Sequence, residues 1–497
     1  MADPLILALD QGTTSTRAIL FDATGAALAE AGRPLQQFYP ADGWVEHDPE
    51  EIFQASVEVL REAVAKAGRE MAEVAAIGIT NQRETVVIWD KATGRPIHRA
   101  IVWQDRRTAE ACERLRDAGH EERVTAVTGL LLDPYFSGTK IAWLLDHEKG
   151  ARARAEAGEL LAGTIDTWLI WKLTGGRVHA TDATNASRTL LFDIGRQQWS
   201  SEMQEMLGVP AALLPEVRDC AGSFGETEAS LLGRAVPICG VAGDQQAALM
   251  GQGCIHPGDM KATYGTGCFL LVNTGETLAY SHTRLLTTVA ARVGGRTTYA
   301  VEGSIFVAGA AIKWLNEEMG VQGGAQGAEE LAMKAREGHG VVLAPAFTGL
   351  GAPWWDAEAR GGIFGLTRDS GLAEIAEAAF DASALQTRDL IEAMRADAPD
   401  VFAGEIEMRI DGGMSKSRWF AQRLADLTGI HVCRATYRET TALGAALFAG
   451  LGASIYRDVE EAAAARPQTE GFDPAMDLHL RESAYARWLD AVMRIRS

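Results

Sequence analysis

The strongest constraint on the fold is a short pattern that recurs where predicted strands end. Its first example lies near the amino terminus, where the apolar run Leu5–Leu9 stops at a single carboxylate, Asp10. The segment Gly12–Arg17 then supplies a glycine, four hydroxyl residues and an arginine, and Ala18–Phe21 begins a second strand. Glycine lets the backbone approach a ligand closely, and the following amides and hydroxyls can hydrogen-bond phosphate oxygens. The pattern predicts a phosphate-binding hairpin, and an ordinary tight hairpin is the alternative from this stretch alone.

Asp10 is the candidate metal-binding residue of this hairpin. A carboxylate at a strand end beside a phosphate turn can hold Mg2+ that bridges the phosphate oxygens. The stretch is not a P-loop, because it lacks the G-x-x-x-x-G-K-[ST] pattern and a strand follows where a P-loop has a helix.

Three further strand ends carry the same combination of glycine with a carboxylate or a hydroxyl: Gly243-Asp244, Gly265-Thr266-Gly267 and Asp411-Gly412-Gly413. Two of the four examples fall in each half of the chain, and the third echoes the first, which indicates two related halves. The length of 497 residues also favours two domains. We therefore expect an N-terminal domain over 1–252 and a C-terminal domain over 253–497.

Composition narrows the class of protein. A formal net charge of −20 argues against a nucleic acid or an anionic membrane surface as partner, because both require a positive field. The six cysteines contain no C-x-x-C pair, which is typical of a reduced cytosol and not of a zinc site or a disulfide framework. No signal peptide or membrane span is evident, so we expect a soluble, cytoplasmic protein.

The remaining pattern predicts alternating strands and helices, with polar clusters at strand ends where α/β proteins bind ligands. One such cluster, Thr80–Thr85, follows a short apolar strand. Helices are predicted around Ile312–Leu315 and over 372–394. The segment Thr181–Arg188 reads as a polar loop, and Glu302–Ala310 reads as the approach to a helix.

The four strand ends together resemble the actin-like ATPase superfamily, in which two phosphate hairpins and an Asp-Gly-Gly turn enclose ATP. Within it the chain resembles the FGGY carbohydrate kinases over nearly its whole length, on the patterns Phe136–His147 and Gly362–Asp381. The resemblance implies an α/β fold of two actin-like (ribonuclease H-like) domains. Each would be a central mixed sheet flanked by helices, with ATP and substrate in a cleft between them.

Five shorter motifs resemble the members of that family that phosphorylate glycerol: Gly43–Asp48, Thr80–Thr85, Asp133–Ser137, Gly243–Ala248 and Tyr264–Phe269. The resemblance implies transfer of the γ-phosphoryl group of ATP to a terminal hydroxyl of glycerol, giving sn-glycerol 3-phosphate and ADP. Small-molecule glycerol would be the substrate, and ATP with Mg2+ would be required.

The same resemblance assigns candidate roles. Asp244 would be the catalytic base, and the glycerol hydroxyls would be bound by Arg83, Glu84, Tyr135, Asp244 and Gln245. Trp103 and Phe269 would hold the carbon face, which suits a ligand with three hydroxyls and a small apolar backbone. Asp10 would orient Mg2+ through water. The phosphates would be held by Thr13, Thr14, Ser15, Arg17 and Thr266, and the nucleotide would be bordered by Gly309, Lys313, Gly413 and Ser417.

Three features depart from the family. Glutamine is common at the position of Lys313 and asparagine at that of Ser417, so these residues bear on nucleotide affinity. The loop Ser230–Ala235 is shorter and less basic than the sugar-bisphosphate feedback loop of some bacterial members.

The resemblance to the family also suggests that the protein forms a homodimer or homotetramer.

Two other functions stay open at this point. One is a kinase of the same family acting on another small polyol or a ketose, although pentulose kinases differ over Thr80–Thr85. The other, from a different class, is an actin- or chaperone-like ATPase, which would bind no polyol.

Overall fold

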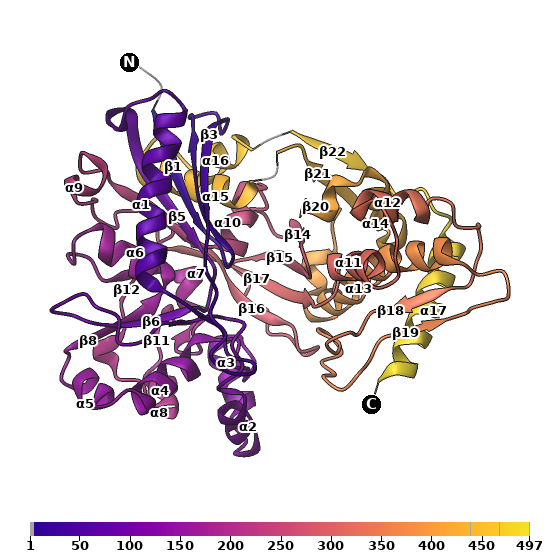
Figure 1. Cartoon of the computed structure of the whole chain (residues 1–497), viewed down its shortest axis with the longest axis horizontal. Coiled ribbons are helices and arrows are strands. Elements are labelled where there is room, and N and C mark those ends of the chain that lie inside the picture. The colour runs from indigo at the N-terminus through magenta and orange to yellow at the C-terminus, as the bar shows by residue number, and fades with distance from the viewer. Residues whose placement is uncertain (1–3, 438, 467, 497) are drawn as a thin grey trace.

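Two mixed β-sheets, one in each half of the chain, organise the structure (Figure 1). The computed structural model describes residues 4–437, 439–466 and 468–496. In spatial order, the first sheet contains β13 (Ile238–Gly243), β5 (Val74–Asn81), β1 (Leu5–Gln11), β2 (Ser15–Phe21) and β3 (Ala27–Pro34). The second contains β16 (Leu286–Val293), β17 (Arg296–Ile305), β15 (Cys268–Gly275), β14 (Met260–Tyr264), β20 (Glu407–Gly412), β21 (His431–Ala435) and β22 (Thr469–Phe472).

The two sheets share one topology. In the first, β1 pairs antiparallel with β2 and parallel with β5, and in the second β14 pairs antiparallel with β15 and parallel with β20. A further antiparallel strand (β3, β17) and a further parallel strand (β13, β21) extend each set. The expected α/β fold of two related halves, each with a mixed central sheet, is confirmed.

Local sequence explains why these elements form. All seven residues of β1 are buried, as expected of a central strand that is covered on both faces. The helix α1 (Pro49–Lys66) begins at Asp48, whose side chain accepts a hydrogen bond from the Glu50 amide at 2.9 Å, and has a proline in its first turn. Its apolar side packs on the first sheet through residues such as Ile52 and Leu60.

Helix α15 (Thr440–Gly452) connects the two halves. It belongs to the second half by sequence, but it packs on β1, β5 and β13 and against α10 (Asp244–Gly251). Small residues permit this approach, because a Cβ atom at Gly78 would collide with the carbonyl group of Ala445. The division at residue 252 stays a prediction, and it falls between α10 and β14.

The helices predicted around Ile312–Leu315 and over 372–394 are confirmed as α11 (Gly309–Glu317) and α13 (Leu372–Asp397). The second half also contains α14 (Arg418–Thr428) and α15. The C-terminal helix is α17 (Leu478–Ile495), and it buries Trp488, Ala491 and Val492. A smaller sheet in the first half contains β4 (Glu46–His47), β7 (Ala100–Ile101), β6 (Val86–Asp90) and β8 (Leu160–Thr164).

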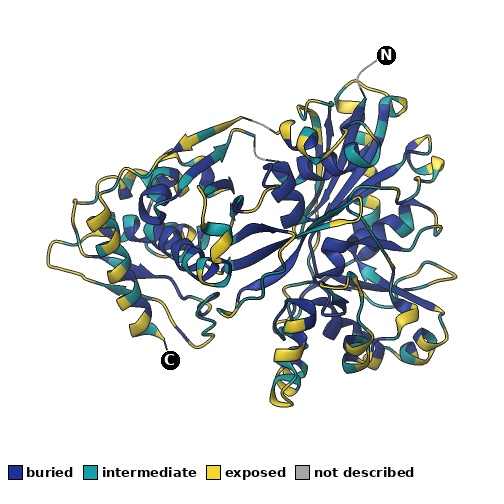
Figure 2. Ribbon diagram, turned by 180° about the vertical axis from the view of Figure 1, so that it is seen from behind, coloured by how far each residue is buried: buried dark blue, intermediate teal, exposed yellow. Residues whose placement is uncertain are grey.

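The other elements lie around this framework. They are α2 (Ala109–Asp117), α3 (Glu121–Thr128), α4 (Ser137–His147), α5 (Ala151–Glu156), α6 (Ile165–Leu173), α8 (Ser201–Leu207), α9 (Ala229–Leu232), α12 (Gly324–Ala332), α16 (Val459–Ala464), β10 (Phe192–Asp193), β11 (Gln198–Trp199), β18 (Val342–Ala344) and β19 (Gly362–Phe364). Exposed residues concentrate on these outer helices, whereas the strands of both large sheets are mostly buried (Figure 2).

Two predictions from the sequence pattern were wrong. The segment Thr181–Arg188 is not a polar loop: it forms the end of β9 (Ala180–Asp182), which pairs with β12 (Glu216–Arg218), and the short helix α7 (Ala183–Ala186), and it is buried throughout. Its polar groups satisfy one another, since Asp182 accepts from the amides of Thr184 and Asn185 at 2.7 and 3.1 Å. Hydrogen bonding of this kind permits burial of a polar sequence.

Glu302 was also misplaced by the sequence pattern. It lies inside β17, paired with Leu271 of β15, and not in the approach to α11.

Among the described residues, no helix combines the length and the apolar character needed to cross a bilayer. All six cysteines are free and buried.

Candidate active site

Arg83 and Glu84 lie where the chain leaves the carboxyl end of β5. Glu84 has a φ of +61°, a backbone conformation that is uncommon outside glycine. Its carbonyl oxygen accepts a hydrogen bond from the Ser137 hydroxyl at 3.0 Å, which helps to fix this conformation. Strained backbone in a buried, over-determined position is typical of functional sites.

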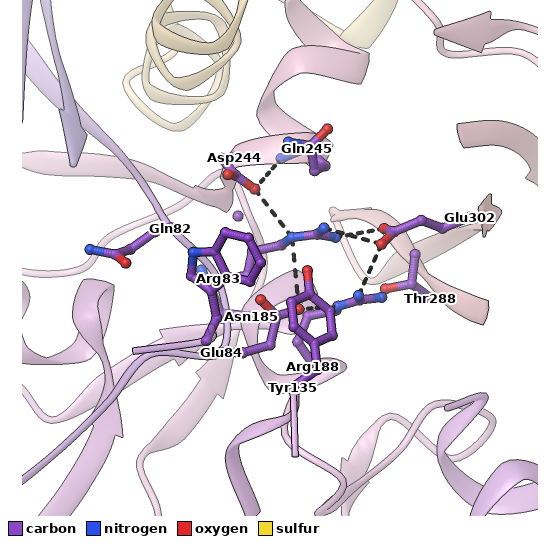
Figure 3. Close-up of polar contacts among 12 residues, drawn as sticks. Gln82, Arg83, Glu84, Tyr135, Asn185, Arg188, Asp244, Gln245, Thr288 and Glu302 are labelled. Atoms are coloured by element: carbon purple, nitrogen blue, oxygen red, sulfur yellow. Dashed lines mark hydrogen bonds and ion pairs between the residues drawn. The ribbon is translucent and has the colours of Figure 1, made fainter. Parts of the chain in front are cut away.

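Four buried charges form one network, which we call the charge cluster: Arg83, Glu84, Arg188 and Glu302 (Figure 3). Nη1 and Nη2 of Arg83 donate to the two carboxylate oxygens of Glu302 at 2.7 and 3.2 Å. Arg188 donates from Nε to Glu84 at 2.7 Å and from Nη2 to Glu302 at 3.0 Å. The four side chains are no more than 2% exposed, so water screens these contacts little.

Burial and pairing act in opposite directions on the two carboxylates. Burial raises the pKa of Glu84, although Arg83 and Arg188 oppose that change. For Glu302 burial also raises the pKa, but Arg188 and Arg83 outweigh it and lower the pKa to about 2. Glu302 is therefore a fixed negative charge at neutral pH.

Asp244 is the first residue of α10, directly after β13. Its Oδ1 lies 3.1 Å from Nε of Arg83 and accepts a hydrogen bond from the Gln245 amide at 2.7 Å. Its side chain is 33% exposed, in contrast to the charge cluster. Among the described residues, no hydrogen bond or ion pair engages Oδ2, so this oxygen is available to a ligand.

Aromatic side chains lie beside the charged groups. The rings of Trp103 and Tyr135 are 5.5 Å apart and nearly perpendicular. Lys140, which is fully buried, donates to the carbonyl oxygens of Tyr135 and Phe136 at 2.6 and 3.2 Å and thereby fixes the turn that carries Tyr135. Phe269 lies on β15 opposite Thr263, whose hydroxyl accepts from Lys261 at 2.8 Å. Lys261 also donates to the side-chain oxygen of Gln245, which links Gln245 on α10 to Thr263 on β14.

The first hairpin has the predicted tight turn, in which the Gly12 amide donates to the Ser15 carbonyl at 2.9 Å. Thr13 accepts from the indole nitrogen of Trp103 at 2.9 Å, so the hairpin and the aromatic wall are in direct contact. Gln82 donates to the side-chain oxygen of Gln11 at 3.0 Å and to the Gly12 carbonyl at 3.3 Å.

Asp10 lies near the end of β1, close enough to Asp244 for the two carboxylates to interact. Its Oδ2 is 3.3 Å from Arg17, and Arg17 also pairs with Glu439 at 2.7 Å. Burial raises the pKa of Asp10 to about 6, and the nearby carboxylates of Glu439 and Asp244 add to the rise while Arg17 opposes it. The protein therefore offsets only part of the negative charge of Asp10. A partly unpaired carboxylate of this kind suits a cation that prefers oxygen ligands, such as Mg2+.

The second hairpin joins β14 to β15, and the start of α11 packs on it. The amides of Ala308 and Ala310 donate to the Thr266 carbonyl at 2.9 and 3.0 Å, and that of Gly309 donates to Gly265 at 3.1 Å. Tyr264 lies opposite Gly412 in the sheet, so the Asp-Gly-Gly turn borders the same hairpin. The structure therefore brings Thr266, Gly309 and Gly413 to one end of the second sheet.

Lys313 and Ser417 lie further out. The Lys313 side chain is 71% exposed on α11 and is 3.7 Å from Glu317. The Ser417 hydroxyl caps α14 by accepting from the Phe420 amide at 2.8 Å. The segment Ser230–Ala235 begins in α9, and its Arg234 donates to the carbonyl oxygen of Ala72 at 2.9 Å.

Arg188, Glu302 and Lys261 were not predicted from the sequence as site residues. The sequence carries a weak indication of each one. Lys261 and Glu302 are charged residues within apolar strands, and Arg188 follows a turn that is rich in hydroxyl residues. Glu302 is flanked by Ala300, Val301 and Gly303, a context in which an unpaired charge would be costly. A charge in such a context requires a buried partner, but the local pattern does not say which one.

A second group of possible metal ligands lies elsewhere. Single ligand atoms of Glu407, His431 and Cys433 lie within 4.8 Å of one another. Glu407 begins β20, whereas the candidate site adjoins the carboxyl end of that strand, and Glu407 is already paired with Arg409 at 2.6 Å. This group plays no part in the site described above.

Comparison with known proteins places the chain in a family. The models of the N-terminal and C-terminal domains of the FGGY family of carbohydrate kinases match residues 5–251 and 260–453. This chain belongs to the FGGY family of carbohydrate kinases. Among curated FGGY kinases, the glycerol kinase of Ectopseudomonas mendocina is 55% identical over 492 residues, covering 99% of both chains. Glycerol kinase 1 of Pseudomonas aeruginosa is 54% identical, again over 99% of both chains.

Solved FGGY kinases have the same overall structure. Plasmodium falciparum glycerol kinase with ADP superposes with a TM-score of 0.93 at 34% identity, covering 99% of this chain and 98% of that one. The xylulose kinase of Rhodospirillum rubrum superposes with a TM-score of 0.87 at 23% identity, covering 99% and 98%, which is a likeness of fold.

Proposed function

We propose that this FGGY kinase transfers the γ-phosphoryl group of ATP to a terminal hydroxyl of glycerol. The products are sn-glycerol 3-phosphate and ADP, so the reaction is the entry step of glycerol breakdown. The observation that carries the proposal is the position of Asp244. Its Oδ2 is open to a ligand, while its Oδ1 is held by Arg83 beside a buried, charged and aromatic site. The identity of about 55% to curated glycerol kinases over 99% of the chain supports glycerol as the substrate.

The side chains suit a small polyol. Arg83 and Glu84 offer charged donors and acceptors to hydroxyl groups, and Tyr135 and Gln245 add neutral ones. The Trp103 and Phe269 rings cover the carbon face. A site built to pair each hydroxyl rejects an analogue that lacks one, because a buried polar group is then left without a partner.

Asp244 acts as the general base. A glycerol hydroxyl attacks the γ-phosphorus, the bond from that phosphorus to the bridging oxygen of ADP breaks, and the hydroxyl proton passes to Oδ2 of Asp244. Phosphoryl transfer depends chiefly on alignment and on neutralising the charge of the phosphate oxygens. The base therefore contributes about 10²–10⁴-fold of the rate.

The two hairpins hold the phosphates. Amides and hydroxyls of Thr13, Thr14, Ser15 and Thr266, with the Arg17 guanidinium, donate to the phosphate oxygens, while Gly309, Lys313, Gly413 and Ser417 border the nucleoside. Asp10 is the residue that would hold Mg2+ through water, since Oδ1 has no hydrogen bond or ion pair within the described residues. Mg2+ would neutralise phosphate charge there.

A coupled ADP-release assay tests the proposal. Glycerol, dihydroxyacetone, xylulose and ribulose are compared at saturating MgATP, and we expect the highest kcat/KM on glycerol. A higher kcat/KM on a pentulose would favour another substrate of the same family. ATP hydrolysis that no polyol stimulates would favour an actin- or chaperone-like ATPase. Size-exclusion chromatography with light scattering tests the expected homodimer or homotetramer.

A further inference from the structure

Glu302 is the only member of the charge cluster that comes from the second half of the chain. It lies on β17, which extends from the second sheet toward the first half (Figure 1), and it meets Arg83 and Arg188 there. Its two oxygens accept three hydrogen bonds, two from Arg83 and one from Arg188. None of the candidate substrate-binding or catalytic roles given above includes Glu302 or Arg188.

We propose that Glu302 and Arg188 are positioning residues for the polyol: they hold Arg83 and Glu84 in the orientation that binds it and keep Arg83 from closing on Asp244. The proposal rests on the proposed function, because it assigns these residues to that same site.

The contacts of Arg83 carry the first step. Both terminal nitrogens of its guanidinium point to Glu302, so only Nε faces Asp244, at 3.1 Å from Oδ1. A bidentate pair of this geometry is the strongest arrangement available to an arginine. Without the Glu302 charge, Asp244 is the nearest ion-paired carboxylate of Arg83, since Glu84 is 3.9 Å away. The guanidinium would then turn to Asp244 and engage the oxygen that must accept the proton.

Packing limits the other movements of Arg83. A Cβ atom at Gly243 would lie 2.8 Å from both Cγ and Cδ of Arg83, so the arginine stem lies flat on the backbone that leads to Asp244. Gln246 accepts from Nη1 at 3.4 Å and is itself held by Thr288 at 3.3 Å. With the stem fixed, the partner of the terminal nitrogens decides where the guanidinium points.

Arg188 carries the second step. It joins the two carboxylates of the charge cluster, donating to Glu84 at 2.7 Å and to Glu302 at 3.0 Å. It follows α7, whose Asn185 exchanges a pair of hydrogen bonds at 3.0 Å with Asn81 at the end of β5. Through Arg188 and Asn185, Glu84 is anchored to the end of β5, and the orientation of its carboxylate is fixed.

The test compares Glu302→Gln and Arg188→Lys with the wild-type full-length protein. Glutamine keeps the shape of Glu302 but removes its charge, and lysine keeps the charge of Arg188 but cannot bridge two carboxylates. We expect the KM and the Kd for glycerol to rise about 10- to 100-fold in each variant, because small misplacements of binding groups cost this much. We expect the KM for ATP to change by less than about twofold, since the nucleotide site is not touched.

Asp219→Asn is the matched control. Asp219 pairs with Arg292 of β16 at 2.7 Å, so this substitution also removes a carboxylate–arginine pair between the two halves, but outside the site. It should lower the melting temperature and leave the glycerol KM unchanged. Glu302→Asp, which restores the charge on a shorter side chain, should recover part of the glycerol affinity lost in Glu302→Gln.

An unchanged glycerol KM in a folded Glu302→Gln would overturn the proposal. If that variant does not fold, an unchanged glycerol KM in Arg188→Lys would overturn the proposal instead, because lysine keeps the buried positive charge. Equal rises in the KM for glycerol and for ATP would also overturn it, since they would indicate a general loss of structure. The substrate preference of the wild-type protein tests the proposed function. The ratio of the KM of a variant to that of the wild type, measured on the best substrate, tests the present proposal, so failure of one can be distinguished from failure of the other.

Discussion

Asp244 differs from the charged residues around it in one respect that bears on catalysis. Each member of the charge cluster is paired and no more than 2% exposed, whereas Asp244 is one-third exposed and uses a single oxygen for its protein contacts. A base needs a free lone pair within reach of the substrate proton. At the residue scale, Asp244 thus differs in exposure and pairing from the buried residues that are predicted to hold the substrate.

Substitution of Asp244 by asparagine should reduce kcat by about 10²–10⁴-fold, because asparagine cannot accept the proton. Oδ1 of asparagine can still accept from Arg83, so the fold and glycerol binding should be retained. Steady-state kinetics, circular dichroism and calorimetric titration of glycerol measure the three properties. A kcat equal to that of the wild type would exclude Asp244 as the base.

At the scale of elements, the two hairpins have the same design but different supports. The first contacts Trp103 and Gln82, and the second is held against the start of α11. Two glycines of the second hairpin differ in the space around them. A Cβ atom at Gly267 would collide with the carbonyl group of Ile305, whereas at Gly265 its nearest atom would be the Gly267 oxygen at 3.9 Å.

We therefore predict that Gly267→Ala displaces the second hairpin and that Gly265→Ala does not. The KM for ATP should rise about tenfold or more in the first variant, because the phosphate donors move relative to the nucleotide. Glycerol binding without nucleotide should be little changed in both. Steady-state kinetics and titration of glycerol distinguish the variants, and equal KM values for ATP would contradict the prediction.

The strand β4 supports the first hairpin through a buried histidine. Nδ1 of His47 lies 3.3 Å from the Gln82 amide nitrogen, and Gln82 in turn contacts the hairpin. Burial lowers the pKa of His47 from 6.5 to about 4. The unfolded chain therefore binds a proton at a pH at which folded His47 remains neutral, and stability must fall as the pH decreases between these values.

We predict that His47 contributes stability fully above about pH 6.5 and that this contribution is lost as the pH falls toward about 4, with a loss of about 1–3 kcal/mol. Urea unfolding at several pH values measures the free energy of unfolding. In His47→Gln, which has no titrating group, the decrease over this range should be smaller than in the wild type. Identical pH dependence of the two proteins would contradict the assignment.

At the scale of the whole molecule, the active site depends on contacts between the halves. Glu302 reaches the charge cluster from β17, and α15 from the second half covers the first sheet next to α10. Asp244 begins α10, so the predicted base lies on the helix that packs directly on α15. A relative movement of the halves would therefore change the distance between the two hairpins.

Binding of both substrates should bring the halves closer, as in other kinases that exclude water during transfer. We expect the radius of gyration from small-angle scattering to decrease when glycerol and a non-hydrolysable ATP analogue with Mg2+ are added together. Each ligand alone provides the control. Scattering curves that do not change with the pair of ligands would rule out a closing movement of this size.

Much of this protein could be predicted from its sequence, for a local reason. The apolar strands, the helix start at Asp48 and the repeated glycine turns each depend on residues that are neighbours in the chain, so these elements and both hairpins could be predicted. The mixed sheets were expected only from the resemblance to a known family. The structure of Thr181–Arg188 could not be predicted, because a run of polar residues is usually exposed to solvent. Here Asp182 and Asn81 provide the internal hydrogen-bond partners that allow the segment to be buried.

Only the tertiary structure decided which charges meet. Arg83 and Glu302 are 219 residues apart, and Arg188 is 114 residues from Glu302. No local pattern can pair such residues, since the pairing depends on how two sheets are placed by the packing of α10 and α15. The sequence by itself determined the strand ends and the alternation of strands and helices, and its resemblance to a known family supplied the two-domain fold and the candidate base. The arrangement that orients Arg83 and Glu84 arises from burial of opposite charges brought together by the fold, where an unpaired charge would be too costly to retain.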